Sequence, residues 1–572
     1  MQDTSPIFKR LSQDKSAREI AYFTMEIALE NDIPSFSGGL GVLAGDTLRS
    51  AADLGIPMVG MTLLHQYGYF QQGLGDSGDQ IEKAVRWHPQ LKLTQLPNYI
   101  EIKIENRTVQ VRVWEYDIVG KFGYVVPVYF LDVNVPENDE QDRRLNKHLY
   151  GGDQYVRLCQ EIILGIGGVR MLRDMGFREI SQYHLNEGHA SLLALELIRE
   201  SGYSSYDKIK EDCIFTTHTP VPAGHDVFDF DLVRRVMKPV YIDYLKDILG
   251  GEQPVNLTTI SLKLSRFING VSAKHAEVSR NMFHNQKIEA ITNGVHSVTW
   301  TSSSFRRLFD QYIPGWDIDP CVLVRTMFIP DEEIWKAHIK AKGKLVRVVA
   351  EETKTQLDLD CLTIGFARRA AAYKRADLIF SDLNRLARFA KEKLQFVFAG
   401  KAHPMDNEGK DVIKRVFQAI QNLQGQVKIA YLENYDMNLG KIITTGVDVW
   451  LNNPQRPREA SGTSGMKAAH NGVLNFSVLD GWWIEGCIEG VTGWAIGPQT
   501  TDNNLADYDE SQDLEDLYDK LENIIIPLYY TNRSEWIRMM KNTIALNASY
   551  FNTHRMIKEY ALRAYRVSPL FQ

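Results

Sequence analysis

Short runs of β-forming residues alternate with longer polar stretches through the second half of the chain. The first three runs are separated by polar, helix-compatible segments of roughly 26 residues. This alternation is typical of βαβ units that build a parallel sheet. The runs are residues 362–367, 394–400, 427–432 and 447–451.

The first half of the chain has weaker patterns. The sequence YVVPVYFLDVNV, within residues 120–135, predicts a strand, and residues 161–175 predict a buried helix that contains glycine. Residues 214–217 and 288–292 resemble short strands followed by loops, and a charge-mixed helical tail is expected over 513–565. We therefore predict an α/β protein with two large lobes, joined near residues 298–330 and separated by a ligand-binding cleft.

Composition narrows the class of protein without indicating its chemistry. The 572 residues carry 65 Lys+Arg and 72 Asp+Glu, a net charge of −7 that gives no reason to expect a nucleic acid partner. Hydrophobic residues at 44% and charged residues at 24% are ordinary globular values and exclude a disordered or coiled-coil chain. No apolar run approaches the length of a membrane span.

The N-terminus and the cysteines favour a reducing, cytoplasmic location. The first 23 residues have no apolar core or cleavage site typical of a secretory signal. The five cysteines are scattered and form no CxxC, so we expect buried free thiols rather than disulfides or structural zinc.

Three loops carry residues suited to phosphate. Residues 37–46 hold several glycines ahead of a helix, which suits an anion site and a purely structural turn equally well. Residues 365–375 place four cations just after a strand. Residues 458–472 offer hydroxyls and backbone amides ahead of a helix, with Lys467 in its first turn. A lysine there could pair with a phosphate or form a Schiff base with a phosphorylated aldehyde cofactor.

Two histidine-bearing loops, residues 184–189 and 218–226, lack the spacing of known metal motifs. We expect them to bind a polar substrate or cap loops, and we predict no metal site. The Asn-Gly turn at residues 292–296 lies near the junction of the lobes.

The third loop, EASGTSGMKAAHNG, resembles the pyridoxal-phosphate lysine segment of the α-glucan (glycogen, starch, maltodextrin) phosphorylases. The resemblance extends in family order, over about residues 21–494, through YFTMEIALEND, SGGLGVLAGD, LNEGHAS, THTPVPAGHD, ITNGVH, FARRAAAYKRA, NYDMNLG and DVWLNNPQRPREASGTSGMKAA. These match the compact bacterial branch. The resemblance implies the type B glycosyltransferase architecture of two Rossmann-like lobes. The expected units are residues 1–300, residues 301–545, and a tail of residues 546–572 packing back on the first lobe.

The resemblance also implies roles for individual residues, with Lys467 as the Schiff-base lysine. The catalytic set is Lys467, Arg369, Lys374 and His218. Pyridoxal 5′-phosphate would be held by Lys467, Thr463, Ser464, Arg368 and Tyr435. Substrate glucan and phosphate would be bound by Gly39, Asn293, Glu459, Ser461 and Gly462, with Arg369 and Lys374 also holding phosphate. His218 is expected to contact the sugar, and Trp300 matches a family aromatic.

The implied reaction is phosphorolysis, in which inorganic phosphate releases a terminal glucosyl unit as α-glucose 1-phosphate with retention. In the family, the cofactor phosphate acts as a proton relay beside the substrate phosphate. Two adjacent dianions repel by several kcal/mol at moderate dielectric, an energy that Arg368, Arg369 and Lys374 offset. The expected partners are α-1,4-glucan or maltooligosaccharide, phosphate and glucose 1-phosphate. Family members often form homodimers, but no apolar stripe in the sequence decides the oligomeric state.

Several positions depart from the long family members. Those read GTGN before Met-Lys, whereas this chain has Thr463-Ser464-Gly465, and they carry a bulkier segment at residues 370–372. The loop after Tyr150 is shorter, and Asp153 could be its acidic residue. Only about twenty residues precede the first lobe, so the resemblance predicts no regulatory N-terminal arm and a constitutive enzyme that AMP does not activate.

Two alternative functions, a nucleotide-sugar glucan synthase and a glucan-binding protein without activity, fit the sequence less well. A nucleotide-sugar glucan synthase of the same architecture would carry Lys-x-Gly-Gly where this chain has Phe36, and a second glutamate where Lys467 stands. A lysine suits pyridoxal, and a glutamate suits a nucleotide ribose. A catalytically silent glucan-binding protein would not need every cationic and cofactor position, yet all are present.

Overall fold

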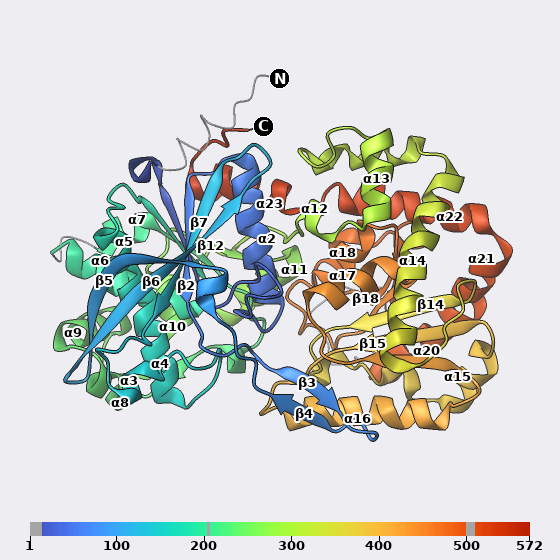
Figure 1. Ribbon diagram of the computed structural model, residues 1–572, viewed down its shortest axis with the longest axis horizontal. Coiled ribbons are helices and arrows are strands. Elements are labelled where there is room, and N and C mark those ends of the chain that lie inside the picture. The colour runs from blue at the N-terminus through green and yellow to red at the C-terminus, as the bar shows by residue number, and fades with distance from the viewer. Residues whose placement is uncertain (1–13, 203–205, 499–508, 572) are drawn as a thin grey trace.

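The computed structural model describes residues 14–202, 206–498 and 509–571 (Figure 1). Residues 1–13, which contribute to the signal-peptide argument, lie outside that part. The described chain forms two α/β lobes side by side, each built around one large sheet. The predicted α/β class with large parallel sheets is confirmed.

The N-terminal lobe is built on a nine-stranded sheet of order β13-β12-β9-β8-β1-β2-β7-β6-β5. Neighbours from β13 to β7 are parallel, and β7, β6 and β5 pair antiparallel. The central strands are buried on both faces, as in parallel sheets covered by helices. The strands are β1 (Ile20–Thr24), β2 (Met58–Leu63), β5 (Thr94–Ile104), β6 (Arg107–Val119), β7 (Val125–Asp132), β8 (Gln182–Asn186), β9 (Cys213–Thr216), β12 (Phe267–Gly270) and β13 (Glu289–Ala290).

Helices cover both faces of this sheet. Helix α2 (Gly39–Leu54) shares a core with one face, and the helical stretch from α4 (Gln154–Ile162) to α5 (Gly168–Asp174) packs on the other. A side chain at Gly168 would lie 2.4 Å from the Phe23 ring, so glycine permits close packing of this helix on β1. The other helices are α3 (Glu140–Arg143), α6 (Leu193–Glu200), α7 (Tyr206–Asp212), α8 (Phe230–Val236), α9 (Pro239–Leu249), α10 (Leu257–Lys263) and α11 (Ala273–Met282).

The C-terminal lobe contains a parallel six-stranded sheet of order β16-β15-β14-β17-β18-β19. The four runs predicted from the sequence form its first four strands. They are β14 (Leu362–Ala367), β15 (Leu394–Ala399), β16 (Lys428–Leu432) and β17 (Val449–Asn452), followed by β18 (Leu474–Val478) and β19 (Gly493–Ile496). The lobe's helices are α13 (Ser303–Tyr312), α14 (Asp331–Thr353), α15 (Leu383–Ala390), α16 (Asn407–Asn422), α17 (Met437–Gly446), α18 (Ser464–Ala469), α19 (Trp483–Gly486), α20 (Glu510–Lys520), α21 (Ile526–Thr531) and α22 (Arg533–Asn542).

The chain passes between the lobes at two places that lie together. The first crossing precedes α12 (Ser297–Trp300), and the second precedes α23 (Thr553–Tyr560). Val295 and Asn552 form a parallel bridge between them, and Thr553 N donates to Val295 O at 3.0 Å. Beyond the second crossing, α23 shares a hydrophobic core with α2 of the N-terminal lobe.

A hairpin from the N-terminal lobe makes a separate contact with the other lobe. Strands β3 (Gln71–Leu74) and β4 (Gln80–Lys83) extend toward α16 (Figure 1). The buried Gln72 amide donates to Gly400 O at 2.8 Å, and its oxygen accepts from Asn434 N at 3.0 Å. Lys410 of α16 pairs with Glu82 at 2.8 Å. The lobes are therefore joined at both ends of their interface.

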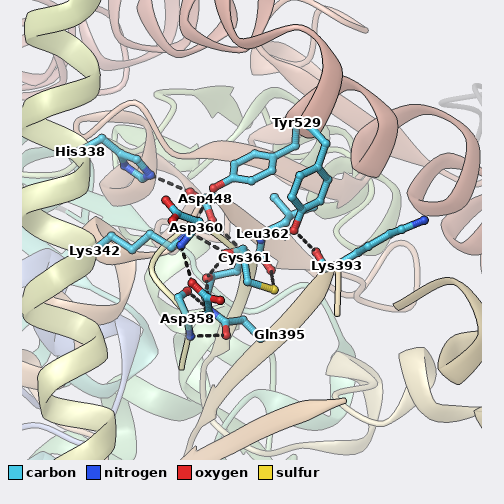
Figure 2. Close-up of polar contacts among 12 residues, drawn as sticks. His338, Lys342, Asp358, Asp360, Cys361, Leu362, Lys393, Gln395, Asp448 and Tyr529 are labelled. Carbon is cyan, nitrogen blue, oxygen red and sulfur yellow. Dashed lines mark hydrogen bonds and ion pairs between the residues drawn. The ribbon is translucent and has the colours of Figure 1, made fainter. Parts of the chain in front are cut away.

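A buried polar network fixes α14 to the sheet of the C-terminal lobe (Figure 2). Asp448 accepts from Lys342 Nζ at 2.6 Å and lies 2.7 Å from His338 Nε2, and none of these three side chains is exposed. Burial opposes ionisation of Asp448, but Lys342 and His338 hold its pKa below the ordinary value. The network lies where β14 and β17 begin, so it is a structural ion pair remote from the opposite strand ends.

The cysteines of the chain are all free thiols, as expected. Cys159, Cys213 and Cys361 are buried, but the expectation of burial is wrong for Cys321, which is exposed, and Cys487 is half-buried. Cys321 follows Pro320 in a 3-10 segment whose buried positions are Pro320, Leu323 and Thr326, leaving the thiol on the solvent side. No helix in the described part of the chain is both long and apolar enough to cross a membrane.

Candidate active site

A cleft of about 620 Å³ lies between the lobes, where parallel strands of both sheets end. In such sheets ligands bind beyond the carboxyl ends of the strands. The residues that follow β1, β8 and β9 line one side, and those that follow β14 to β17 line the other. The position of the cleft is therefore set by the topology of the two sheets.

Every residue to which the resemblance assigns a role lines this cleft. They come from loops separated by up to 428 positions, since Gly39 and Lys467 both contribute. The fold therefore brings these residues together in one place. They are Gly39, His218, Asn293, Arg368, Arg369, Lys374, Tyr435, Glu459, Ser461, Gly462, Thr463, Ser464 and Lys467, with Trp300 beside them.

Lys467 is the fourth residue of α18, which begins directly after the small-residue loop, as predicted. The side chain is 7% exposed, and its Nζ lies 3.7 Å from the centre of the Trp300 ring. The pKa of the ammonium is lowered to about 8, mainly by burial; Asp46 opposes this shift and Lys441 adds to it. A buried amine that deprotonates near neutral pH is suited to nucleophilic attack on an aldehyde.

Glu459 pairs with two of the predicted phosphate ligands. Its Oε2 accepts from Arg368 Nη2 at 2.6 Å and from Lys374 Nζ at 2.9 Å. Burial opposes ionisation of this carboxyl, but the two cations lower its pKa to about 2. Glu459 also holds its own loop, because its backbone N donates to Asp480 Oδ2 at 2.9 Å. The carboxylate thus keeps two cations oriented at the cleft.

The remaining cations of residues 365–375 differ in environment. Arg369 is exposed and lines the cleft, and within the described residues it has no ion pair. Arg375 instead turns away and pairs with Asp513 of α20 at 2.6 Å, while donating to Asn453 O. Three of the four cations therefore serve the cleft, and the fourth fixes the fold.

The segment predicted as a glycine-rich loop, residues 37–46, is helical from Gly39, where α2 begins, so only Ser37 and Gly38 precede the helix at the cleft. Glu26 Oε2 accepts from Ser37 N at 2.6 Å and from Gly38 N at 3.2 Å. Gly39 and Leu40, the first residues of the helix, line the cleft, where helix amides lack intrahelical partners. A Cβ added to Gly38 or Gly39 would meet no atom within 4 Å. The glycines therefore leave space for a ligand, and packing within the protein does not require them.

The cleft is lined by residues that carry buried polar atoms without partners, and one of these residues lies in the loop before Lys467. Ser461 Oγ, Arg368 Nη1 and Asn293 Oδ1 are buried and have no hydrogen-bond partner. Ser464 Oγ accepts from Trp450 Nε1 at 3.1 Å, which leaves its own hydrogen free to donate. Gly462 has φ +84°, a backbone conformation that favours glycine. Buried polar atoms without partners indicate a ligand that would satisfy them.

The two histidine loops have different environments. His218 Nε2 lies 2.6 Å from Asn186 Oδ1, so the ring donates there, and burial lowers its pKa to about 3. His218 is therefore a neutral hydrogen-bonding group at the cleft. His184 is a core residue, held by Tyr565 OH at 2.6 Å and Thr216 Oγ1 at 2.9 Å. Asp153, considered as an acidic loop residue, caps α4 by accepting from Val156 N.

Several residues that line the cleft were not predicted from the sequence. Lys401 and His403 follow β15 and line it, and burial lowers the pKa of Lys401 to about 8. Ligands bind beyond the carboxyl ends of parallel strands, so the end of the strand predicted at residues 394–400 indicates both residues. Arg157 also lines the cleft, where it forms an ionic cluster with His189 and Asp226 of the two histidine loops. Arg157 Nη2 and His189 Nδ1 lie 2.8 and 2.9 Å from Asp226 Oδ2.

Comparison with known proteins gives one family. The family model described as carbohydrate phosphorylase matches residues 20–119 and 242–491. The chain is 40% identical to the maltodextrin phosphorylase of Thermococcus litoralis, over 96% of this chain and 70% of that protein. It is 35% identical to the glycogen phosphorylase of Aquifex aeolicus, over 97% and 87%. It is also 32% identical to an uncharacterised protein of Methanocaldococcus jannaschii, over 96% and 99%.

Proposed function

Because the chain belongs to the carbohydrate phosphorylase family, we propose that this cleft catalyses phosphorolysis of α-1,4-glucans. The chain is a glucan phosphorylase. The specific reaction that we propose is transfer of the glucosyl unit at the non-reducing end of the glucan to inorganic phosphate. The product is α-glucose 1-phosphate, with the configuration at the anomeric carbon retained. The observation that carries this assignment is the convergence of a buried lysine, three cations and an open glycine-rich helix start on one cleft.

The residues present fit pyridoxal 5′-phosphate. Lys467 has a buried amine of lowered pKa, and Trp300 stacks beneath it. Arg368 Nη1 is buried without a partner, and the Ser464 hydroxyl is free to donate. The holding set is Lys467, Thr463, Ser464, Arg368 and Tyr435. When bound, this cofactor supplies a phosphate group that can exchange a proton with the substrate phosphate.

The chain's own cations bind and orient the substrate phosphate. Arg369 offers a planar guanidinium at the open part of the cleft, and Lys374 offers a point charge inside it. Gly39 admits an oxygen close to the first amides of α2. Because Lys374 and Arg368 already pair with Glu459, an arriving phosphate joins or displaces an existing ion pair. The cations are therefore oriented before substrate arrives.

The glucosyl unit is held from both lobes. Asn293 and Ser461 carry buried polar atoms without partners, which sugar hydroxyls can satisfy. Gly462 shapes the loop, and Glu459 is an ionised acceptor at its edge. His218 is neutral, with the amide of Asn186 fixing one ring nitrogen as the donor. It orients a hydroxyl and does not act as an imidazolium acid near neutral pH.

The experiment that tests this function separates three ways of cleaving or making glucan. The purified protein is incubated with a maltooligosaccharide ladder, with and without inorganic phosphate, and products are resolved by anomer. Phosphate-dependent release of α-glucose 1-phosphate, shortening each chain by one unit, is expected. Release of free glucose without phosphate would contradict the proposal. So would chain growth that requires a nucleotide sugar.

A further inference from the structure

Three side chains from distant parts of the sequence meet where the two crossings join the N-terminal lobe. Asp53 lies in the last turn of α2, His296 precedes α12, and His554 lies in the first turn of α23. Asp53 Oδ2 is 2.8 Å from His296 Nε2 and 3.6 Å from His554 Nε2. The two imidazoles are stacked, with centroids 5.8 Å apart. One carboxylate oxygen thus faces the same nitrogen of both rings.

The opposite nitrogens of the two rings are held by hydroxyl groups. His296 Nδ1 lies 2.7 Å from Thr299 Oγ1, and His554 Nδ1 lies 3.4 Å from Ser50 Oγ. Metal-binding histidines usually have such a partner on the second nitrogen, which fixes the tautomer and aims the first at the ion. Both rings therefore have the tautomeric support that a metal ligand needs.

His554 provides an independent indication of a missing ligand. The residue is 1% exposed, and its Nε2 is buried without a hydrogen-bond partner. A buried nitrogen without a partner costs free energy, and here it is aimed at a carboxylate that is too distant for a good hydrogen bond. An atom placed between His554 and Asp53 would satisfy both.

We propose that Asp53, His296 and His554 form a binding site for a divalent transition-metal ion of the Zn²⁺ type. The three candidate ligand atoms lie within 4.8 Å of one another. In a tetrahedral zinc site with nitrogen and oxygen ligands, neighbouring ligand atoms are about 3.3 Å apart. The 2.8 and 3.6 Å separations lie on either side of that value, so each has to change by about 0.3 to 0.5 Å for an ion to be held. Two imidazoles and one carboxylate leave a fourth position for water.

The surroundings of Asp53 orient its carboxylate at this place. Its other oxygen, Oδ1, accepts from Lys121 N at 2.7 Å, which leaves Oδ2 to face the two imidazoles. The Asp53 side chain is 14% exposed, which gives an ion a path from solvent.

A second acidic and histidine cluster in the cleft lacks these properties. Glu161, His189 and Asp226 also lie within 4.8 Å of one another. However, Arg157 pairs with Asp226 at 2.8 Å and with Glu161 at 3.2 Å, so a guanidinium already occupies the position of a cation. Within the part of the chain that the structure describes, Asp53 pairs with two histidines and with no arginine, which is why we assign the metal there.

An ion at Asp53 would link α2 to both crossings. Asp46, two turns earlier on α2, accepts from Trp300 Nε1 at 2.6 Å and from His296 N at 3.2 Å. Trp300 in turn underlies Lys467. The metal would therefore stabilise the segment that connects the lobes beneath the cleft, without touching substrate.

The test uses the full chain with its affinity tag removed, stripped with chelator and titrated with Zn²⁺ by calorimetry and with Co²⁺ by visible absorption. One equivalent per chain is expected, with tetrahedral cobalt bands and a raised melting temperature. D53N and H554Q should each weaken binding at least tenfold and abolish those bands. H284Q, which removes an exposed histidine, should bind as the wild type does.

Two outcomes would overturn the proposal. One is the absence of saturable Zn²⁺ and Co²⁺ binding by the wild-type chain. The other is binding by D53N and H554Q that matches the wild type. Circular dichroism of metal-free variants reports folding, and if H554Q does not fold, H296Q carries the same comparison. Because the readout is metal binding, the result is independent of the proposed phosphorolysis.

Discussion

The Nζ of Lys467 lies 3.7 Å from the centre of the ring of Trp300, the last residue of α12, which directly follows the first crossing between the lobes. The indole is itself fixed, because its Nε1 donates to Asp46 of α2 at 2.6 Å. The lysine of the C-terminal lobe therefore rests on a platform held by the N-terminal lobe. Any change in the angle between the lobes changes the environment of this amine.

The buried amine should cost stability in the cofactor-free protein. The pKa of Lys467 is lowered from 10.5 to about 8, so folding disfavours the protonated form. This cost is absent above pH 10.5 and grows as pH falls toward 8. We expect Lys467→Met to raise the free energy of unfolding at pH 7 by about 2 kcal/mol, after subtracting the lost contact with Trp300.

Urea unfolding of cofactor-free wild type and K467M at pH 7 and at pH 10 measures this effect. The difference between the two proteins should shrink at the higher pH. A difference that does not change with pH would show that burial of charge at Lys467 is not its source.

The ion pairs of Glu459 should stabilise the cleft and respond to anions. Glu459→Gln leaves Arg368 and Lys374 without their carboxylate, and we expect a loss of about 3 kcal/mol at pH 7. Inorganic phosphate or sulfate should restore more stability to the variant than to the wild type, because an anion can pair with the released cations. Phosphorolysis should fall by about 100-fold or more, through the lost sugar contact.

The pH dependence of this variant follows from the sign of the shift. The pKa of Glu459 is lowered from 4.5 to about 2, so its contribution is complete above pH 4.5 and is lost as pH falls toward 2. The stability difference between wild type and E459Q should therefore shrink below pH 4.5. A difference that grows on acidification would contradict the paired, ionised state of Glu459.

Gly39, at the start of α2, should be needed for the use of phosphate as a substrate and not for the stability of the fold. A Cβ at Gly39 meets no protein atom within 4 Å, so Gly39→Ala should leave the melting temperature unchanged or slightly higher. The methyl group would instead occupy ligand space. We expect kcat/KM for phosphate to fall about tenfold or more, measured with saturating maltooligosaccharide.

Gly343 of α14 provides a matched control for that substitution. Its Cβ would meet only Leu359, at 4.0 Å. Gly343→Ala should stabilise the helix by about 1 kcal/mol and leave phosphate kinetics unchanged. Equal kinetic effects of the two substitutions would show that Gly39 has no special relation to phosphate.

The network around Asp448 should support the fold without taking part in the reaction. Asp448→Asn removes the carboxylate that pairs with the fully buried Lys342, and we expect a loss of about 3–5 kcal/mol. The network drawn in Figure 2 lies at the starts of β14 and β17, and His338, Lys342 and Asp448 do not line the cleft. Specific activity per folded molecule, measured at a temperature where D448N is fully folded, should remain within about twofold of the wild type. A larger loss would place Asp448 in the catalytic machinery.

The sequence predicts the C-terminal sheet well because its strands are short, fully buried and regularly spaced. The runs at 362–367 and 394–400 coincide closely with β14 and β15. The antiparallel pair β5–β6 was missed, although Val109, Val111 and Val113 alternate with polar residues in β6. Its outer face is polar, so this pair lacks the continuous apolar run that indicates a parallel strand.

The position of the site could be predicted from sequence motifs, but the ion pairs within the site could not. Loops after consecutive strands must meet at one edge of a sheet, which brings Arg368 and Lys467 together. That Glu459 would pair with Arg368 and Lys374 depends on distances between loops 85 or more positions apart. The meeting of Asp53, His296 and His554 depends on the tail returning to α2, which no local pattern of residues encodes.

The central claim is that this cleft binds pyridoxal 5′-phosphate on Lys467 of an α-glucan phosphorylase. The most direct measurement is peptide mapping by mass spectrometry of freshly purified, active protein after borohydride reduction, with K467A treated in parallel. One pyridoxyl phosphate group is expected on the peptide that contains Lys467. None is expected on K467A, which should remain folded and inactive. Active protein without this adduct, or phosphorolysis retained by K467A, would contradict this claim.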